Sequence, residues 1–255
     1  HPPRPRRAAA RGVMIRIGVP SKGRLMEDTF AWFGARGLKM RRSGAEREYS
    51  GTSDLEGVQP VFLSAGEIPR ELAAGRIHLG VTGSDLVREQ LGEDEVEELA
   101  RLGFGQADLI IAVPNVWIDV ETVDDLDAAA AAFRAAHGFR LRIATKYHRL
   151  VREFLQAQGV ADYALIDSQG ATEGTVKNGT AEAVADITSS GETLRANHLR
   201  VLSDGLIHAS EAVLWSSRAA KWLPEDRAAM VRLASMLGVR GPQGWPLSTV
   251  DRILG

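Results

Sequence analysis

Short apolar runs alternate with longer amphipathic segments along most of the chain. Runs of four to six apolar residues predict buried strands, and the longer segments, apolar every three or four positions, predict helices. This alternation is typical of parallel β-sheets covered by helices, so the predicted fold class is α/β. The expected strands are 15–19, 60–63, 77–81, 109–113, 141–144, 164–166, 183–187, 199–202 and 212–215, and the expected helices are 25–35, 68–74, 84–91, 123–136, 150–158, 193–196 and 224–237.

Polar stretches after apolar strands indicate two domain crossings. Pro114-Asn115-Val116-Trp117 follows a strongly apolar run, and the chain is expected to return near residues 197–200. This predicts a discontinuous domain I (14–113 plus 200–218) and an inserted domain II (114–199). Strand ends that gather between two such domains form a cleft, where ligands commonly bind.

The two ends of the chain are expected to lie outside these domains. Residues 1–13 are basic and rich in proline, without the apolar stretch of a secretory signal, and are interpreted as a tag remnant or overlong start without order. Residues 219–255 are expected to form one amphipathic helix and a tail. The missing export signal favours a cytoplasmic protein.

Composition limits the possible chemistry. A formal net charge of −2 argues against a general nucleic-acid surface, and no apolar stretch is long enough to span a bilayer. The absence of cysteine excludes disulfides, thiolate metal sites and a cysteine nucleophile. The six histidines lack metal-ligand spacing, so no protein metal site is predicted.

The segment from Ala185 to Leu194 is the strongest candidate for a binding site. An apolar strand ends at Asp186 and runs directly into small hydroxyl and glycine residues, a composition that suits the binding of a phosphate. Asp186 is placed to accept hydrogen bonds from a sugar hydroxyl or to hold magnesium brought by a diphosphate. An ordinary strand, turn and helix cap is the structural alternative. The predicted phosphate-binding residues are Thr188, Ser189, Ser190, Gly191, Glu192 and Thr193.

A second glycine turn carries two positive charges. After the first strand, Lys22 and Arg24 flank Gly23, which suits binding of an anion. Neither the Walker P-loop nor the G-x-G-x-x-G fingerprint is present. A solvated basic turn is the alternative explanation.

Five motifs in order resemble one family, the ATP phosphoribosyltransferases of histidine biosynthesis. The resemblance covers residues 14–218 and is carried by P-S-K-G-R-L at 20–25, E-I-P with G-x-I-H-L-G-V-T-G-x-D-L at 67–86, L-G-F-G-x-A-D at 102–108, I-A-T-K-Y at 143–147, and G-A-T-E at 170–173 with A-D-I-T-S-S-G-E-T-L-R-A-N at 185–197. It implies two domains like those of type II periplasmic binding proteins, with the active site in the interdomain cleft.

The resemblance also implies a reaction. A pentosyl-transferring glycosyltransferase of this family joins N1 of ATP to 5-phosphoribosyl 1-pyrophosphate (PRPP) and releases pyrophosphate, with Mg²⁺ carried by the substrates. The 188–193 loop is then expected to hold the 5-phosphate, with Asp186 and Glu173 beside the ribose. The residues expected to meet the pyrophosphate or ATP are Lys22, Gly23, Arg24, Arg47 and Tyr147, and the expected catalytic set is Asp186, Glu173 and Lys22.

Two segments depart from the family pattern. Leu63-Ser64-Ala65-Gly66 stands where many members carry an arginine, and Gly174-Thr175-Val176-Lys177 replaces an apolar-Ala-Pro turn. Beyond Arg218 only 37 residues remain, too few for a histidine-sensing domain. By resemblance this is a short-form subunit, a homodimer within a hetero-oligomer that includes a regulatory subunit similar to histidyl-tRNA synthetase.

Other functions stay open at this stage. The first alternative is a ligand-binding or sensing protein on the same scaffold, because fold alone does not fix function. Such a protein does not need the 188–193 turn together with the Lys22-Gly23-Arg24 turn. A phosphoribosyltransferase of another pathway usually carries two adjacent acids in the PRPP strand, whereas Asp186 stands alone. An inactive paralogue is the third alternative, because one expected substrate arginine is missing.

Overall fold

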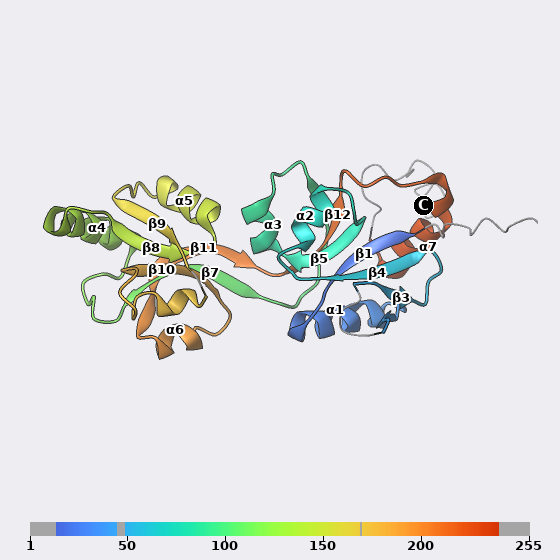
Figure 1. The fold of residues 1–255 in the computed structure, drawn as a ribbon, viewed down its shortest axis with the longest axis horizontal. Coiled ribbons are helices and arrows are strands. Elements are labelled where there is room, and N and C mark those ends of the chain that lie inside the picture. Colours follow the sequence, from blue (N-terminus) through green and yellow to red (C-terminus); the bar gives the residue numbers. More distant parts are fainter. Residues whose placement is uncertain (1–13, 45–48, 169, 240–255) are drawn as a thin grey trace, which may run out of the picture. The chain divides into compact units, whose positions relative to one another are not determined.

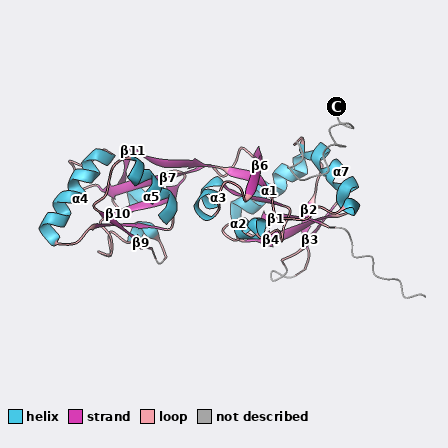
Figure 2. Ribbon diagram, turned by 90° about the horizontal axis from the view of Figure 1, so that it is seen from above, coloured by secondary structure: helices cyan, strands magenta, loops and turns pink. Residues whose placement is uncertain are grey.

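The computed structural model describes residues 14–44, 49–168 and 170–239 (Figure 1). The chain divides into two compact units. Unit 1 contains the chain up to Leu86, Gln90–Leu102 and the part from Ala212 onward, and unit 2 contains Val87–Glu89 and Gly103–Glu211. Each unit has its own five-stranded sheet, accompanied by helices (Figure 2). None of the described helices is long and apolar enough to cross a bilayer.

Unit 1 is built on a mixed sheet in the order β4-β1-β5-β12-β6. β1 runs parallel to β4 and β5, whereas β12 is antiparallel to both β5 and β6. α1 packs on β1, and α2 packs on β1, β5 and β12. The strands are β1 (Ile15–Pro20), β4 (Val58–Leu63), β5 (Leu79–Gly83), β6 (Val96–Arg101) and β12 (Ala212–Ser217), with a separate hairpin of β2 (Met40–Arg42) and β3 (Gly51–Ser53); the helices are α1 (Gly23–Ala35), α2 (Ile68–Ala73), α3 (Ser84–Gln90), η2 (Pro224–Asp226) and α7 (Arg227–Leu237).

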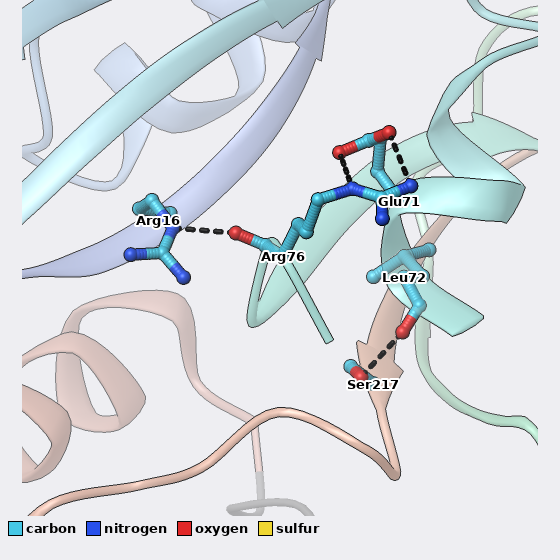
Figure 3. A network of polar contacts seen from close by, with 5 residues as sticks. All are labelled: Arg16, Glu71, Leu72, Arg76 and Ser217. Carbon is cyan, nitrogen blue, oxygen red and sulfur yellow. Dashed lines mark hydrogen bonds and ion pairs between the residues drawn. The ribbon is translucent and has the colours of Figure 1, made fainter. Parts of the chain in front are cut away.

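A polar network joins three elements of unit 1 (Figure 3). Arg76, which follows α2, binds the carboxylate of Glu71 through two nitrogens at 2.7 and 2.9 Å. The side chain of Arg16 on β1 donates to the carbonyl of Arg76, and Ser217 at the end of β12 donates to the carbonyl of Leu72. The Leu72 carbonyl also accepts from the N–H of Gly75 at 3.1 Å, so the Ser217 hydroxyl adds a second bond that links β12 to the end of α2.

Unit 2 has a second mixed sheet in the order β11-β7-β10-β8-β9. β8 runs parallel to β10 and β9, while β7 is antiparallel to β10 and β11. α4 packs on β8 and β11, and α6 packs on β11. The elements are β7 (Ala107–Pro114), α4 (Val123–His137), β8 (Leu141–Thr145), α5 (His148–Ala157), β9 (Tyr163–Asp167), η1 (Thr172–Gly174), β10 (Ala183–Thr188), α6 (Glu192–Ala196) and β11 (Leu199–Ser210).

A buried cluster fixes the strand that leads to the candidate site. Val184 on β10 packs in it with Ala144 of β8, Ile110 of β7 and Leu194 of α6. These side chains are at most 4% exposed. Burial of such apolar surface stabilises the fold by about 25 cal/mol per Å². The strand and the short helix on either side of the 188–193 loop are therefore anchored in one core.

The structure corrects two predictions about strands. Both sheets are mixed, because β12 and β7 run antiparallel to their neighbours, whereas the apolar pattern favoured parallel sheets. The edge strand β6 and the hairpin β2–β3 were not predicted, since their short or charged sequences bury few side chains. Apolar runs identify buried strands but carry no information on their direction.

The boundaries of the units also differ from the predicted domain boundaries. The chain enters unit 2 after Leu102 and leaves it after Glu211, instead of at residues 113–114 and 199–200. β7 and β11 are the reason, because they pair with each other and β7 pairs with β10 in the second sheet. β11 extends over twelve residues to Ser210, and the polar Ser203-Asp204-Gly205 in its middle hid that length in the sequence.

Candidate active site

Strand register brings Lys146 close to Asp186. β8 and β10 run parallel, with Thr145 opposite Ala185. Lys146 and Asp186, the next residues along the two segments, are therefore placed side by side at the same end of the strands, since parallel strands advance in step. The exposed ammonium of Lys146 lowers the pKa of Asp186, although other effects outweigh it.

Asp186 is paired with a second carboxyl group. η1 carries Glu173 against β10, and the two side chains form a hydrogen bond. The pKa of Asp186 is raised from 3.8 to about 6, mainly by burial and also by the negative charge of Glu173 and the shared hydrogen bond, while the N–H of Ile187, 2.8 Å from Oδ1, lowers it. The pair is therefore placed to hold a proton near neutral pH, as adjacent carboxyl groups do.

The short η1 helix is held by hydroxyl groups around it. Thr172 is 2% exposed, and its hydroxyl lies 2.6 Å from that of Ser168. The buried Thr175 hydroxyl donates to the carbonyl of Thr172 at 2.7 Å. These contacts fix the residues on both sides of Glu173 and so fix the position of its carboxyl group.

The 188–193 loop, which follows β10, is closed by its own hydrogen bonds. The Thr188 hydroxyl accepts from the N–H of Gly191 at 2.8 Å, and the Ser190 hydroxyl accepts from the N–H of Glu192 at 3.3 Å. Gly191 has φ +74°, a conformation that side chains rarely adopt, and it precedes α6. The loop therefore turns sharply between β10 and α6 (Figure 1).

Two hydroxyl groups of this loop remain available for a ligand. Ser189 and Thr193 are exposed, and within the described residues their side chains have no hydrogen-bond partner. Arg195 adds positive charge, and its guanidinium donates to the carbonyl of Ser190 at 3.1 Å. Hydroxyl donors beside a cation suit the oxygen atoms of a phosphate.

The basic turn of unit 1 lies at the start of α1. Lys22 and Arg24 are exposed and form no ion pair with any described residue, and Gly23 has φ +72°. α1 has thirteen residues and no acidic side chain in its first turn. Its N-terminal N–H groups and these two charges therefore favour an anion.

Sequence analysis missed Arg42 on β2, which lies beside this turn. Its guanidinium donates to the carbonyl of Ser21 at 2.8 Å and lies over the ring of Phe62, 5.0 Å from the centroid. No local signal distinguishes it from other surface arginines, because β2 reaches the turn only through tertiary packing. Lys146 was also missed as a site residue, although it directly follows an apolar strand.

Tyr147 and Arg47 are the two remaining predicted site residues. Tyr147 is 7% exposed and precedes α5, and its N–H donates to the buried Thr145 hydroxyl at 2.9 Å. Its ring is therefore mainly packed inside unit 2. Arg47 lies outside the described residues.

The structure brings together part of the predicted set. Asp186, Glu173 and the 188–193 loop belong to one end of β10 in unit 2, whereas Lys22, Gly23 and Arg24 belong to unit 1. No group of three or more His, Cys, Asp or Glu that would hold a metal occurs among the described residues. The carboxyl pair of Asp186 and Glu173 offers oxygen ligands of the kind that magnesium prefers.

Sequence comparisons point to one family. The family model described as "HisG: ATP phosphoribosyltransferase" matches residues 64–238. A protein of Cereibacter sphaeroides named ATP phosphoribosyltransferase is 73% identical over 232 residues, covering 90% of this chain and 98% of that protein. One of the same name from Mesorhizobium japonicum is 46% identical, covering 88% and 100%. A third, from Bradyrhizobium diazoefficiens, is 49% identical, covering 83% and 66%.

Solved structures show the same fold at low sequence identity. The ATP phosphoribosyl transferase (HisG:HisZ) complex from Thermotoga maritima contains a chain with TM-score 0.63 and 17% identity, covering 94% of this chain and all of that chain. A histidine kinase sensor domain with similarity to periplasmic binding proteins has TM-score 0.50 and 13% identity, covering 95% and 93%. The likeness to the type II periplasmic binding protein fold predicted from the sequence is thus confirmed.

Proposed function

Because the chain belongs to the ATP phosphoribosyltransferase family, we propose that unit 2 binds PRPP through the 188–193 loop, Asp186 and Glu173. The family reaction joins N1 of ATP to C1 of PRPP, forms N1-(5-phosphoribosyl)-ATP and releases pyrophosphate. It is the first step of L-histidine biosynthesis and is a pentosyl transfer. The observation that carries the proposed site is the carboxyl pair directly before a loop with two unpartnered hydroxyl groups.

The loop is proposed to bind the 5-phosphate of PRPP. The unpartnered hydroxyl groups of Ser189 and Thr193 donate to phosphate oxygens, while Thr188 and Ser190 hold the loop in shape. Gly191 lets the backbone turn without a side chain. Glu192, whose N–H is bonded to Ser190, lies at the first position of α6.

The carboxyl groups are proposed to act on the ribose. Departure of pyrophosphate from C1 builds positive charge on the sugar, and an ionised Asp186 or Glu173 stabilises that charge. The N1 atom of adenine attacks as a neutral ring nitrogen, so the N1–C1 bond forms as the C1–O bond breaks and no strong base is needed. Lys146 is proposed to favour ionisation of Asp186.

Unit 1 is proposed to supply cations for the phosphate groups of the substrates. Lys22 and Arg24 have no ionic partner within the described residues, and Gly23 leaves the start of α1 open. Arg42 adds a third charge beside the turn. Lys22 is the proposed catalytic cation for the leaving pyrophosphate, and Arg47 is assigned to the ATP phosphates by resemblance only.

Magnesium is the proposed cofactor, carried by the diphosphate of the substrate. Two adjacent carboxyl groups, Asp186 and Glu173, fit a hard cation because they are oxygen ligands that repel each other when both are ionised. When bound, the ion neutralises charge on the leaving pyrophosphate. Tyr147 is proposed to contact adenine through the small exposed part of its ring.

The proposed assembly follows from family resemblance. The Thermotoga maritima protein was solved as a HisG:HisZ complex. We propose that this chain likewise forms homodimers within a hetero-oligomer that includes a histidyl-tRNA-synthetase-like regulatory subunit, in the cytoplasm.

Product formation tests the function directly. The purified chain is incubated with ATP, PRPP and magnesium, and phosphoribosyl-ATP is detected by mass spectrometry. The product is expected with the native chain and strongly reduced with Ser189→Ala/Thr193→Ala. Absence of product together with no rise in melting temperature on adding PRPP and magnesium would overturn the proposal and favour an inactive paralogue.

A further inference from the structure

Unit 2 contains a surface cavity that the proposed reaction does not use. Its volume is about 520 Å³, within the range of small-molecule sites. None of its lining residues belongs to the 188–193 loop or to the carboxyl pair. It is lined by Arg140, Arg152, Gln156, Gly159, Val160, Ala161, Tyr163 and Leu165.

Four polar side chains at this cavity lack protein partners. Within the described residues, Arg140, Arg152, Gln156 and Tyr163 make no side-chain hydrogen bond or ion pair. Arg152 lies close enough to Tyr163 for its charge to lower the pKa of the phenol, which burial raises. Two guanidinium groups, an amide and a phenol thus surround one cavity with their donors free.

Neighbouring arginines of the same unit behave differently. Arg134 pairs with Asp162 at 2.9 Å, and Arg142 pairs with Glu182 at 3.0 Å. Asp162, which lies between the lining residues Ala161 and Tyr163, is therefore paired with an arginine that does not line the cavity. Arg140 and Arg152, which line the cavity, have no acidic partner among the described residues.

The other lining residues include apolar side chains, and two carbonyl groups at the end of α5 already have donors. Val160 is 4% exposed, and Ala161 and Leu165 lie beside it in the lining. α5 ends at the cavity, where exposed carbonyl groups would repel an anion. The N–H groups of Gly159 and Val160 already donate to the last carbonyl groups of this helix at 3.1 and 2.9 Å.

We propose that this cavity binds a small phosphate monoester that carries a ring. Two guanidinium groups match the charge of a phosphate monoester, which approaches −2 at neutral pH, and each presents a rigid pair of donors. The apolar floor and the ring of Tyr163 accept the flat organic part of the ligand. This inference does not depend on the proposed transferase function.

Phenyl phosphate is a suitable probe, because it combines both features in the smallest form. The full chain, labelled with ¹⁵N, is titrated with phenyl phosphate and followed by amide and arginine side-chain NMR signals. The perturbed signals are expected at residues 140, 152–165 and their immediate neighbours. Inorganic phosphate, which lacks the ring, and benzoate, which has a single charge, are each expected to bind at least tenfold more weakly.

Variants separate this cavity from the proposed 5-phosphate loop. Arg140→Ala and Arg152→Ala are each expected to weaken phenyl phosphate binding about tenfold, the loss of a charge-assisted hydrogen bond. Arg134→Ala, which removes an arginine outside the cavity, is the matched control and should leave the affinity unchanged. The unperturbed part of each NMR spectrum shows that the variant is folded.

Three results would overturn the inference. The first is a titration that perturbs only signals of residues 188–193, which would place the phosphate in the loop. The second is equal affinity of the native chain and the Arg152→Ala and Arg140→Ala variants. The third is tighter binding of benzoate than of phenyl phosphate, which would contradict a site for a doubly charged anion.

Discussion

Replacement of Asp186 by asparagine should make the unliganded protein more stable while it removes activity. The carboxyl group is partly buried and faces Glu173, and its pKa is raised from 3.8 to about 6. Ionisation at neutral pH therefore destabilises the folded state. Asparagine keeps an oxygen that accepts the N–H of Ile187 but has no charge.

The magnitude follows from the shift in pKa. A difference of about two pKa units corresponds to about 3 kcal/mol at 1.36 kcal/mol per unit. Because the carboxyl group is only partly buried, screening by solvent reduces the expected gain to about 1–2 kcal/mol. For a protein of this size, 1 kcal/mol shifts the melting temperature by about 2–4 °C.

The sign of the pH dependence is specific. Below pH 3.8 the carboxyl group is protonated in both the folded and unfolded states, so it costs no stability. As pH rises from 3.8 to about 6, the carboxyl group ionises in the unfolded state while it stays protonated in the folded state, so stability is lost. Above about pH 6 the group is ionised in both states, and the loss is constant. The advantage of Asp186→Asn should therefore grow between pH 4 and pH 6.5 and then level off.

Melting temperatures of the native chain and the variant, measured between pH 4 and pH 8, test this reasoning. Asp108→Asn is the matched control, since it removes one carboxylate from an exposed position of the neighbouring strand β7. A variant that is equally or less stable at pH 7.5, or a stability difference that does not change with pH, would refute the account of Asp186. Turnover should fall far more than ATP binding.

The remaining predictions concern other parts of the structure. The value of kcat/KM for PRPP is expected to rise near pH 6 as Asp186 ionises. Lys146→Met should move this rise to higher pH, because Lys146 lowers the pKa of Asp186. An unchanged pH profile would exclude an electrostatic role of Lys146. Gly191→Ala should lower stability by about 1 kcal/mol and weaken PRPP binding, because the φ of Gly191 is +74°. Thermal melts and PRPP titrations test this prediction. Gly174→Ala is the control, since Gly174 has neither a positive φ nor a close neighbour. Burial lowers the pKa of His78 from 6.5, so the unfolded state takes up the proton first and stability should fall as pH drops below about 6.5. Urea unfolding between pH 5 and 7.5 should show a smaller loss for His78→Gln, and equal losses would argue against this residue.

Local sequence was enough to predict the elements that carry the candidate site. The apolar run before Asp186 and the small residues after it predicted β10, the loop and the following helix, and all three are present. The run that precedes Lys22 predicted β1 and α1 in the same way. Such predictions succeed because alternating burial, glycine turns and helix starts depend on residues a few positions apart.

Site residues that come from distant parts of the chain were harder to predict. Glu173 was assigned by family resemblance, because η1 reaches β10 only after the intervening turns fold. Lys146 takes its place beside Asp186 through the register of β8 and β10. Arg42 meets the basic turn through the β2–β3 hairpin, which the sequence pattern did not reveal.

The sequence by itself determined the α/β class, the two glycine turns and the family, since each is encoded in contiguous residues. Tertiary structure decided the strand directions, the unit to which β7 and β11 belong, and the carboxyl pair. The physical reason is that strand partners are selected by the burial of whole sheet faces, a property of the entire unit. The raised pKa of Asp186 has the same origin, because only the folded unit removes water from it and places Glu173 beside it.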